Sequence, residues 1–540
     1  MKALQSAAAL LLCLFFVLPF AGCSREEESN AGKSFTYHLT REPSTLDPQI
    51  AQGEDAAVVI NALYEGLARL DEDGNAVPGA AESWESSDGF TTYTFHLKEG
   101  ATWSDGKTPV TAADFVYAFQ RALDPQTASS TCEPMLCLKN ARAVQAGDMA
   151  VTELGVYAQD EYTLVVELEF PLEDFPVLTA SPVFMPCNQE FFQGTAGRYG
   201  LNYACVLGNG PFVIDGRYGW DPGKRINLTA SRTYQGTVLP SDLKLPLGSS
   251  EVDVSDPVEA VASGTVDAIA LTAEEAAEAE ERGCTITSFQ DTVWGLCFNL
   301  SSASAPELAN ENVRKAFLLS LSREALLENI PSGAEAAEGA VPPAVSADGG
   351  SYREQAGPIA FPAQAEDPAA LMQAGLAELG AESPPSITIL CPEDPQVTAM
   401  VNSILVVWNN TFGQYFNMAP LEESALQSRV SAGDYSVALC SFQPGGNDPV
   451  ALLSLFETGA AGNVTGFSLA EYDSLVEQAR FQSGEEKLAS CLAAETMLAE
   501  RAVFLPLYYG EHCFASAPGV TGVVFRPYGG GIDFTRAGKE

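Results

Sequence analysis

Few residues of this chain are arranged as catalytic or cofactor-binding sites require. Residues 31–34 read AGKS, the ending of a phosphate-binding loop, but the glycine that such a loop needs five residues before Gly32 is Glu27. The sequence contains no GxSxG nucleophile elbow, no HExxH zinc motif and no CxxC pair. We therefore expect a protein that is not an enzyme and that needs neither a cofactor nor a metal.

Histidine and cysteine, the side chains most often used in catalysis or metal binding, also form no site. The three histidines fall in or beside predicted strands, where core or surface packing explains them better than catalysis: His38, His96 and His512. Twelve cysteines are spread over a large chain, which does not amount to a disulfide scaffold. Cys132 and Cys137 either close a short disulfide loop or remain buried free thiols.

Cys23 is the cysteine whose surroundings predict a chemical modification. Lys2 gives the chain a positive start, and residues 7–20 are apolar apart from one proline, which suits the core of a secretory signal peptide. The small residues Ala21 and Gly22 precede Cys23, an arrangement that resembles the bacterial lipoprotein box. The alternative is an ordinary signal peptide, cut near Ala21, with Cys23 incidental.

Cleavage before Cys23 would remove residues 1–22 as a lipoprotein signal peptide and leave an acylated thiol at the new N-terminus. Residues 23–34 are then polar and charged, and they bury too little apolar surface to offset their ordering entropy. We expect them to form a flexible tether. Localisation follows as the extracytoplasmic face of the cell membrane, through a lipid anchor.

The charge balance excludes one class of partner. The chain carries 71 acidic and 28 basic residues, a formal net charge of −43. Nucleic acids and anionic lipid head groups both require basic patches, so we expect no nucleic-acid partner. No segment after the leader reaches the about 18 uninterrupted apolar residues of a spanning helix. The chain beyond the anchor is expected to be water-soluble and long enough for two or three domains.

Strands and helices alternate along the chain. Residues 35–39 and 93–97 have the alternation of strands, and residues 58–70 have helical spacing. Thr111 with Asp114 predicts a capping box for a helix that Asp124-Pro125 ends. Later segments predict an α/β lobe, with strands at 387–391 and 435–442 and helices at 396–409 and 422–432. Between them, residues 332–368 lack a period and read as an irregular excursion.

Long ordered phrases, rather than any single motif, carry a family resemblance. They include REPSTLDP (41–48), ALYEGLARLDEDGNAVPGAAESWE (62–85), YTFHLKEGATWSDGKTPVTAADFVYAFQRALDP (93–125), GNGPF (208–212) and FLPLYY (504–509). Together they resemble the extracytoplasmic solute-binding proteins of the oligopeptide/dipeptide/nickel ABC importer family, family 5. The resemblance covers about residues 35 to 530.

The resemblance implies a fold that periodicity alone does not give. It is an α/β, two-lobed periplasmic-binding-protein-like fold, type II-like, with an extra domain inserted in the N-terminal lobe. The implied divisions are lobe I at residues 35–64, 186–292 and 512–540, the inserted domain at 65–185, and lobe II at 293–511.

The resemblance also implies a function. Family members bind a peptide in an interlobe cleft and deliver it to a membrane ABC permease. We therefore expect a peptide ligand, ABC permease subunits as partners, membrane attachment through the lipid anchor and a monomeric state. A general peptide receptor should hydrogen-bond the peptide backbone, which adding the ligand as an extra strand achieves.

Ligand-binding residues are assigned by the same resemblance. One strand partner is expected at Gln52, Gly53 and Glu54, for which the alternative is an exposed loop before a helix. The other lies at the end of a second-lobe strand and comprises Cys440, Ser441, Phe442 and Gln443. Trp294 either lines the cleft floor or packs in the core. Asn447 and Tyr508 complete the predicted site.

Gly445 departs from the pattern of many peptide-binding relatives. These follow the second-lobe strand with Trp, two residues and an Asp that pairs with the peptide's α-ammonium, whereas this chain reads SFQPGGNDP, with Phe442 and Gly445 at those positions. Without that carboxylate, desolvation of the peptide ammonium is not compensated, which costs roughly several kcal/mol of binding free energy. Asp448 is a conceivable substitute, although the family keeps an acid there too, which favours a structural role.

Three functions stay open on this sequence. The first is a receptor for peptides, including N-blocked, longer or signalling peptides. The second is the same fold binding a non-peptide solute such as a metal chelate, a glycan or haem, although few histidines argue against direct nickel ligation. The third is a sensing or adhesion lipoprotein without a permease.

Overall fold

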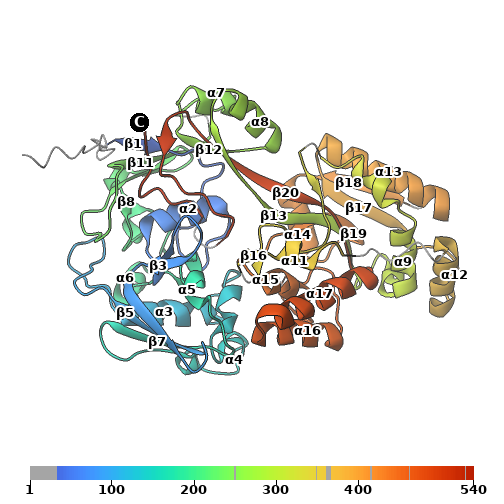
Figure 1. Ribbon diagram of the computed structural model, residues 1–540, viewed down its shortest axis with the longest axis horizontal. Coiled ribbons are helices and arrows are strands. Elements are labelled where there is room, and N and C mark those ends of the chain that lie inside the picture. Colours follow the sequence, from blue (N-terminus) through green and yellow to red (C-terminus); the bar gives the residue numbers. More distant parts are fainter. Residues whose placement is uncertain are drawn as a thin grey trace, which may run out of the picture.

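The computed structural model describes residues 33–248, 251–331, 333–347, 349–359, 367–413, 416–460, 462–528 and 531–539. The predicted signal peptide, Cys23 and nearly all of the predicted tether lie outside the described residues. The chain forms two lobes joined by long strands (Figure 1). The first lobe contains the N-terminal half of the chain and its C-terminal end, and the second contains most of the segment between them.

The first lobe is built around two main sheets. One has the order β1-β11-β10-β8 with β9 paired to β10, and the other is an antiparallel sheet of order β4-β5-β7-β6. The strands of the first sheet are β1 (Ser34–Thr36), β8 (Phe212–Ile214), β9 (Trp220–Asp221), β10 (Arg225–Ala230) and β11 (Asp242–Pro246). Those of the second are β4 (Ala81–Ser87), β5 (Thr92–Leu97), β6 (Val156–Ala158) and β7 (Thr163–Glu167). A separate hairpin pairs β2 (Ala68–Leu70) with β3 (Ala76–Pro78), and β21 (Val520–Thr521) pairs with β22 (Gly538–Lys539).

Short helices connect these strands. They are α2 (Glu54–Leu63), α3 (Ala112–Leu123), α4 (Ala141–Gln145), α5 (Phe175–Leu178) and α6 (Gln189–Gly194), with 3-10 turns η1 (Glu133–Cys137), η2 (Val151–Glu153), η3 (Pro182–Phe184), η4 (Tyr203–Cys205) and η5 (Gly216–Tyr218). The predicted capping box is confirmed, because Asp114 Oδ2 accepts hydrogen bonds from Thr111 N at 2.8 Å and Thr111 Oγ1 at 3.1 Å. Helix α3 ends at Leu123, with Asp124 as its C-cap before Pro125, as predicted.

One sheet passes through both lobes. Its order is β12-β20-β13-β19-β17-β18, with β14 added to β20. The strands are β12 (Ala268–Leu271), β13 (Thr285–Phe298), β14 (Glu335–Ala336), β17 (Ile387–Pro392), β18 (Phe416–Leu421), β19 (Val437–Phe442) and β20 (Phe504–Ser516). β13 and β20 are antiparallel to each other and cross from the first lobe into the second (Figure 1). Their pairing is irregular between Phe289 and Thr292.

Helices cover the sheet in the second lobe. They are α9 (Glu311–Leu319), α10 (Arg323–Leu327), α11 (Tyr352–Ala356), α12 (Pro368–Leu379), α13 (Pro395–Phe412), α14 (Glu423–Ser431), α15 (Pro449–Leu453), α16 (Ala470–Phe481) and α17 (Gly484–Glu500), with η6 (Pro306–Ala309), η7 (Ser454–Phe456) and a hairpin of β15 (Ser346–Ala347) and β16 (Gly350–Ser351). Near the strand crossing, α7 (Pro257–Ala262) and α8 (Ala273–Glu281) pack on β12 and β20. Helix α13 buries residues three and four apart, among them Val397, Met400, Val401 and Ile404, which gives it one apolar face.

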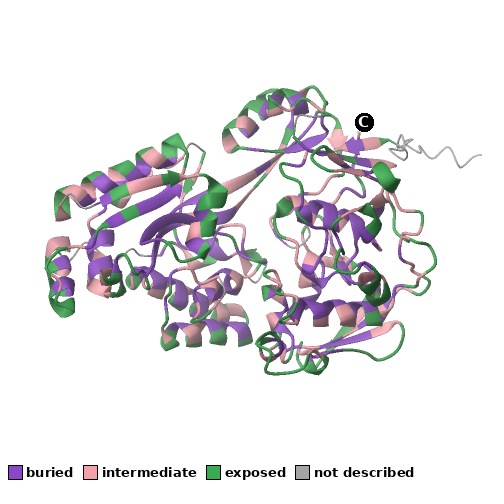
Figure 2. Ribbon diagram, turned by 180° about the vertical axis from the view of Figure 1, so that it is seen from behind, coloured by how far each residue is buried: buried purple, intermediate pink, exposed green. Residues whose placement is uncertain are grey.

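Each lobe has its own apolar core (Figure 2). The main cluster of the first lobe includes side chains of the 65–185 segment, such as Phe95 and Phe115, and a smaller one lies under α7 and α8. The sheet of the second lobe separates two clusters, one with Cys440 and Phe442 and the other with Leu439 and Trp408. Alternate residues of β19 therefore enter opposite cores, as the period of two in a strand requires.

All cysteines in the described ranges are free. Cys132 and Cys137 are buried thiols, so of the two alternatives left by the sequence the short disulfide loop is not formed. Within the described ranges, no helix combines the length and apolar character needed to cross a membrane.

Candidate functional site

A cavity of about 640 Å³ lies between the two lobes. Its volume is in the range of small-molecule binding sites, about 300–1,000 Å³. From the first lobe it is lined mainly by the turn between β2 and β3, by η1 and by the segment before and within α5, including Glu133, Phe170, Glu173, Asp174 and Leu178, with Arg142 of α4. From the second lobe it is lined by Ser346, Gly445, Gly446, Asn447, Asp448, Ser454, Arg480 and Lys487, among others.

Several charges of this lining are already neutralised within the second lobe. Lys487 Nζ lies 2.5 Å from Asp448 Oδ2, and Asp448 Oδ1 accepts the Val450 N–H at 2.8 Å as the N-cap of α15. Arg480 donates to Glu457 at 2.8 Å and to Glu477 at 2.9 Å. Asp448 therefore has a structural role, and Arg480 is held by its own carboxylates.

Two pairs of residues join the lobes in or beside the cavity, and we call them the tip contacts. Ser454 Oγ donates a long hydrogen bond to Glu133 Oε1, at 3.4 Å. The rings of Phe170 and Phe481 meet edge to face, with centroids 5.4 Å apart. The backbone of Gly445 is also close, because a Cβ atom built on it would lie 3.7 Å from Glu133 Oε2.

A second set of polar residues, which we call the crossing cluster, lies where β13 and β20 pass between the lobes. It consists of Glu54, Asp291, Gln443 and His512. Asp291 is buried, and its carboxylate accepts hydrogen bonds from His512 Nδ1 at 2.9 Å and from Gln443 Nε2 at 3.0 Å. On its other side, His512 Nε2 lies 3.7 Å from Glu54 Oε1 at the start of α2. These contacts link the first lobe to the end of β19.

The environment of His512 favours its charged form. The hydrogen bond to Asp291 raises the pKa of the imidazole, and the charges of Asp291, Glu54 and Glu423 add to that effect. Partial burial acts in the opposite direction but is outweighed. His512 is therefore held as a cation to higher pH than an ordinary histidine.

The predicted second-lobe segment ends β19 beside an open backbone edge. β13 pairs with β19 as far as Phe442, but β17 pairs with it only at Val437 and Ala438. No strand among the described residues is assigned to the other edge of β19 beyond Ala438. Backbone groups from Cys440 onward are thus placed where an added strand could pair with them.

Side chains along this segment alternate between core and solvent. Ser441 and Gln443 are exposed, whereas Cys440 and Phe442 are buried. Phe442 packs on Phe456 and Phe504, with ring centroids 4.8 and 5.1 Å away. A ligand strand would meet the backbone and the exposed side chains here.

The predicted first-lobe segment leads into α2, which begins at Glu54, and is exposed at Gln52, Gly53 and Glu54. Gln52 Nε2 donates to Ser130 Oγ. Gly53 has φ 88°, which a residue with a side chain adopts only with strain, and a Cβ there would meet nothing within 4 Å. The glycine thus serves the turn into α2.

The remaining predicted residues divide between the cavity and the sheet. Asn447 lines the cavity, and its Oδ1 accepts the Ser346 N–H at 2.7 Å. Trp294 is half-buried and stacks on the buried Tyr508, with centroids 6.1 Å apart and rings within 10° of parallel. Trp294 is also opposite Ser441 in the sheet.

Four of the predicted residues lie at two places that join the lobes. Gly445 and Asn447 line the cavity, while Glu54 and Gln443 stand at the two ends of the crossing cluster. Four further residues at these places were not predicted as site residues: Glu133, Asp291, Ser454 and His512. Their partners are too distant in the sequence for spacing to reveal them, with Ser454 and Glu133 321 residues apart.

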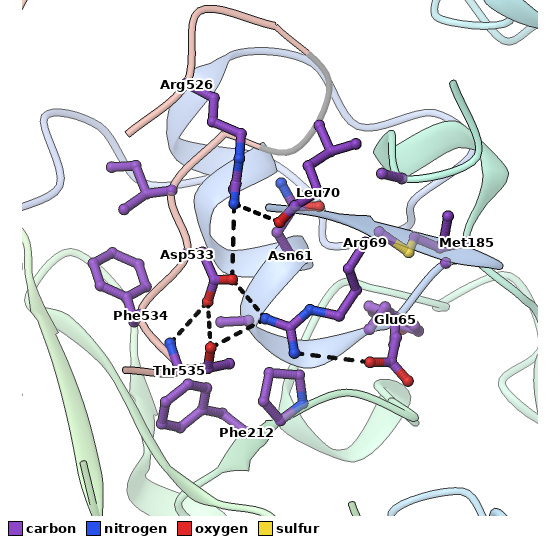
Figure 3. Close-up of a pocket in the computed structure, with 17 residues that line it drawn as sticks. Asn61, Glu65, Arg69, Leu70, Met185, Phe212, Arg526, Asp533, Phe534 and Thr535 are labelled. Atoms are coloured by element: carbon purple, nitrogen blue, oxygen red, sulfur yellow. Dashed lines mark hydrogen bonds and ion pairs between the residues drawn. The ribbon is translucent and has the colours of Figure 1, made fainter. Parts of the chain in front are cut away.

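A different polar pocket lies inside the first lobe and holds the C-terminal segment in place (Figure 3). Arg69 Nη2 contacts Asp533 Oδ2 at 2.6 Å and Thr535 Oγ1 at 3.1 Å, and Arg526 Nη2 lies 3.9 Å from the same carboxylate. Its volume is only about 50 Å³. The charges here pair with one another, which marks the pocket as a structural network.

Comparison with known proteins gives consistent matches over most of the chain. The family model described as "Bacterial extracellular solute-binding proteins, family 5 Middle" matches residues 75–463. The dipeptide-binding protein DppE of Bacillus subtilis is 27% identical over 98% of both chains. A probable deoxycholate-binding periplasmic protein of Escherichia coli, YgiS, is 28% identical over 88% of both chains.

Solved structures share the fold. The substrate-binding domain of an oligopeptide ABC transporter from Bacillus anthracis superimposes with a TM-score of 0.78 at 26% identity. The match covers 94% of this chain and 99% of that one.

Proposed function

Because the chain belongs to family 5 of the bacterial extracellular solute-binding proteins, we propose that it binds peptides between its lobes and delivers them to an ABC permease. Members of this family are extracytoplasmic receptors that bind solutes, and the relatives named above include a dipeptide-binding protein. The observation that carries the peptide assignment is the open backbone edge of β19 beyond Ala438, in the strand that leads to Gly445 of the interlobe cavity. Such an edge suits a ligand that is recognised through its main chain.

We also propose that the lobes close on the ligand. The expected divisions, at residues 292/293 and 511/512, fall inside β13 and β20, next to the irregular pairing after Phe289. Two crossing strands with a local irregularity suit a small hinge rotation. The lobes would then comprise residues 35–64, 186–292 and 512–540, with 65–185 inserted, and residues 293–511.

Peptide binding is tested by identifying what the protein carries. The full-length chain, expressed with its own leader and purified without refolding, is examined by native mass spectrometry. Bound mass that fragments into peptides supports the assignment. If the protein is purified without a bound ligand and binds nothing from a mixed library of tri- to hexapeptides, the peptide assignment is contradicted.

Membrane anchoring through Cys23 is part of the proposal and has a separate test. Cys23→Ser removes the thiol that would be acylated, so the variant should appear in the medium or accumulate as an uncut precursor. Fractionation with mass measurement of the mature chain distinguishes these from the parent. A variant that stays in the membrane at normal mature mass would exclude the anchor.

One observation favours a second candidate function, binding of a non-peptide solute. The relative named as a probable deoxycholate-binding protein is 28% identical to this chain over 88% of it, against 27% over 98% for the dipeptide-binding one. The native mass spectrum separates the candidates, because a bound steroid, glycan or chelate does not fragment into amino-acid residues. The proposed receptor acts as a monomer with one solute per chain.

A further inference from the structure

Glu133 is an acid of the first lobe that reaches the second. It begins η1, directly after the buried Cys132, and its carboxylate lies in the interlobe cavity. Oε1 accepts the hydrogen bond from Ser454, while Oε2 has no hydrogen-bond or ion-pair partner within the described ranges. Oε2 faces Gly445 instead, because a Cβ atom built on that glycine would lie 3.7 Å from it.

The charges around Glu133 leave this oxygen available. Arg480 and Arg142 both lower the pKa of Glu133, but neither forms an ion pair with it. The guanidinium of Arg480 is held by Glu457 and Glu477. Asp448, another acid of the lining, is already bound by Lys487.

The surroundings of Glu133 also make an added cation effective. Glu133 is exposed to the cavity, and protein of both lobes near the carboxylate raises its pKa through desolvation. A cation placed there is attracted more strongly than one at an open surface, because less water screens the interaction. Gly445 contributes no side chain, so the space beside Oε2 is left for a group of the ligand.

We propose that Glu133 binds an ammonium group of the solute, in the cavity beside Oε2 and Gly445. This proposal rests on the proposed function and deepens it, since it names the group of the peptide that is recognised and places the acid on the first lobe. The α-ammonium of the peptide is the first source of such a group, and a lysine side chain is the second. An acid on one lobe, hydrogen-bonded to the other, also couples ligand charge to lobe closure.

The test is a competition between peptide libraries that differ only at the amino group. The probes are random tetrapeptides without lysine or arginine, one library with free and one with acetylated N-termini, mixed in equal amounts. Peptides retained by the full-length protein are quantified by mass spectrometry. We expect the wild type to retain the free form at least about tenfold more, as a charged hydrogen bond implies, and Glu133→Gln to reduce this ratio to about threefold or less.

Glu190→Gln is the matched control. Glu190 lies in the first turn of the short helix α6 of the same lobe, is exposed, and does not line the cavity. Glu190→Gln removes the same charge, so the ratio of free to acetylated peptides that this variant retains should stay at the wild-type value. A third library, acetylated at the N-terminus but with one lysine, identifies whether a side-chain ammonium serves instead.

The outcomes distinguish a failure of this inference from a failure of the proposed function on which it rests. If peptides bind but Glu133→Gln leaves every ratio unchanged, Glu133 is not the ammonium site and peptide binding stands. If no library is retained by the wild type, both the function and the inference fail.

A rescue variant guards against a merely structural effect of the substitution. Gly445 does not have the left-handed backbone that would strain a side chain. Adding Gly445→Asp to Glu133→Gln places a carboxylate beside the same space from the opposite lobe. The double variant should regain at least half of the lost preference on a logarithmic scale, and a ratio equal to that of Glu133→Gln would overturn the assignment.

Discussion

In the crossing cluster, a buried carboxylate accepts two hydrogen bonds, and the strands around it are paired through both lobes. At the tip, the lobes meet through one hydrogen bond of 3.4 Å and one ring pair whose Phe481 is 48% exposed. The same two lobes are thus joined firmly where the chain crosses and weakly where the ligand would enter.

This difference separates two roles that contacts between lobes can have. Removing a partner from a buried polar group costs the full desolvation of what remains, so the crossing cluster should govern stability. Exposed contacts contribute little to stability, but they can shift an equilibrium between open and closed arrangements that lie within a few kcal/mol, roughly. Substitutions at the two places should therefore change different observables.

Asp291→Ala should have the largest effect. It removes the buried acceptor shared by His512 and Gln443, and we expect the free energy of unfolding to fall by about 3 kcal/mol. Calorimetric melting or urea unfolding measures the change. The control is Asp434→Ala, which breaks an ion pair between an exposed aspartate and Arg429 and should cost less than about 0.5 kcal/mol. Equal losses in the two variants would contradict the buried role of Asp291.

Phe481→Ala should change conformation more than stability. An edge-to-face aromatic pair contributes about 0.5–1.5 kcal/mol, so its loss should shift the open-to-closed ratio up to about tenfold. Small-angle scattering of the unliganded protein should give a larger radius of gyration, and an added binding peptide should restore the smaller one.

Leu379→Ala provides the matched control for this measurement. Leu379 is likewise an exposed apolar residue that ends a helix of the second lobe, α12. Its substitution should leave the radius of gyration unchanged. If Phe481→Ala does the same, the tip contacts do not hold the lobes together.

His512 makes the crossing cluster sensitive to pH. Its pKa is raised in the folded state, so the stability gained from its charged form is fully present below the unfolded pKa, about 6.5. This contribution is lost as pH rises through the higher folded pKa. Because the side chain is 39% exposed, we expect it to be about 1 kcal/mol or less.

The measurement is the difference in melting temperature between wild type and His512→Gln from pH 5.5 to 9. It should be largest at the acidic end and shrink as pH rises. His96→Gln, at a histidine 3.8 Å from Glu85 on a surface strand, gives the background. A difference that grows with pH would mean that neutral His512 is the stabilising form.

Local signals in the sequence predicted many elements well. The capping box before α3 was predicted from Thr111 and Asp114 alone, and it forms. The helix predicted at 58–70 was too long, because α2 ends at Leu63. A Cβ atom on Gly66 would lie 2.1 Å from the backbone oxygen of Thr179, so the backbone there requires glycine. The residues around Gly66 in the sequence give no sign of this tertiary contact.

Long-range partners account for most of what could not be predicted. The irregular excursion within 332–368 is held by buried Glu495, whose Oε1 accepts from Val341 N at 3.0 Å and whose Oε2 accepts from Tyr352 Oη at 3.0 Å. Asp291 and His512 are likewise 221 residues apart. Local sequence patterns predict helices and strands, whereas pairings between residues this far apart depend on the tertiary fold.

The smallest expected effect concerns Glu54, the first-lobe end of the crossing cluster. Its side chain is 64% exposed and lies 3.7 Å from His512, so Glu54→Gln should cost less than about 0.5 kcal/mol of stability. The same change should lower the pKa of His512, because Glu54 supplies part of the negative charge that raises it. An NMR titration of the imidazole measures this. Glu423→Gln removes a weaker contributor and should lower the pKa by less, and high salt should reduce both effects. A stability loss near that of Asp291→Ala would instead mean that the exposed pair joins the lobes as firmly as the buried one.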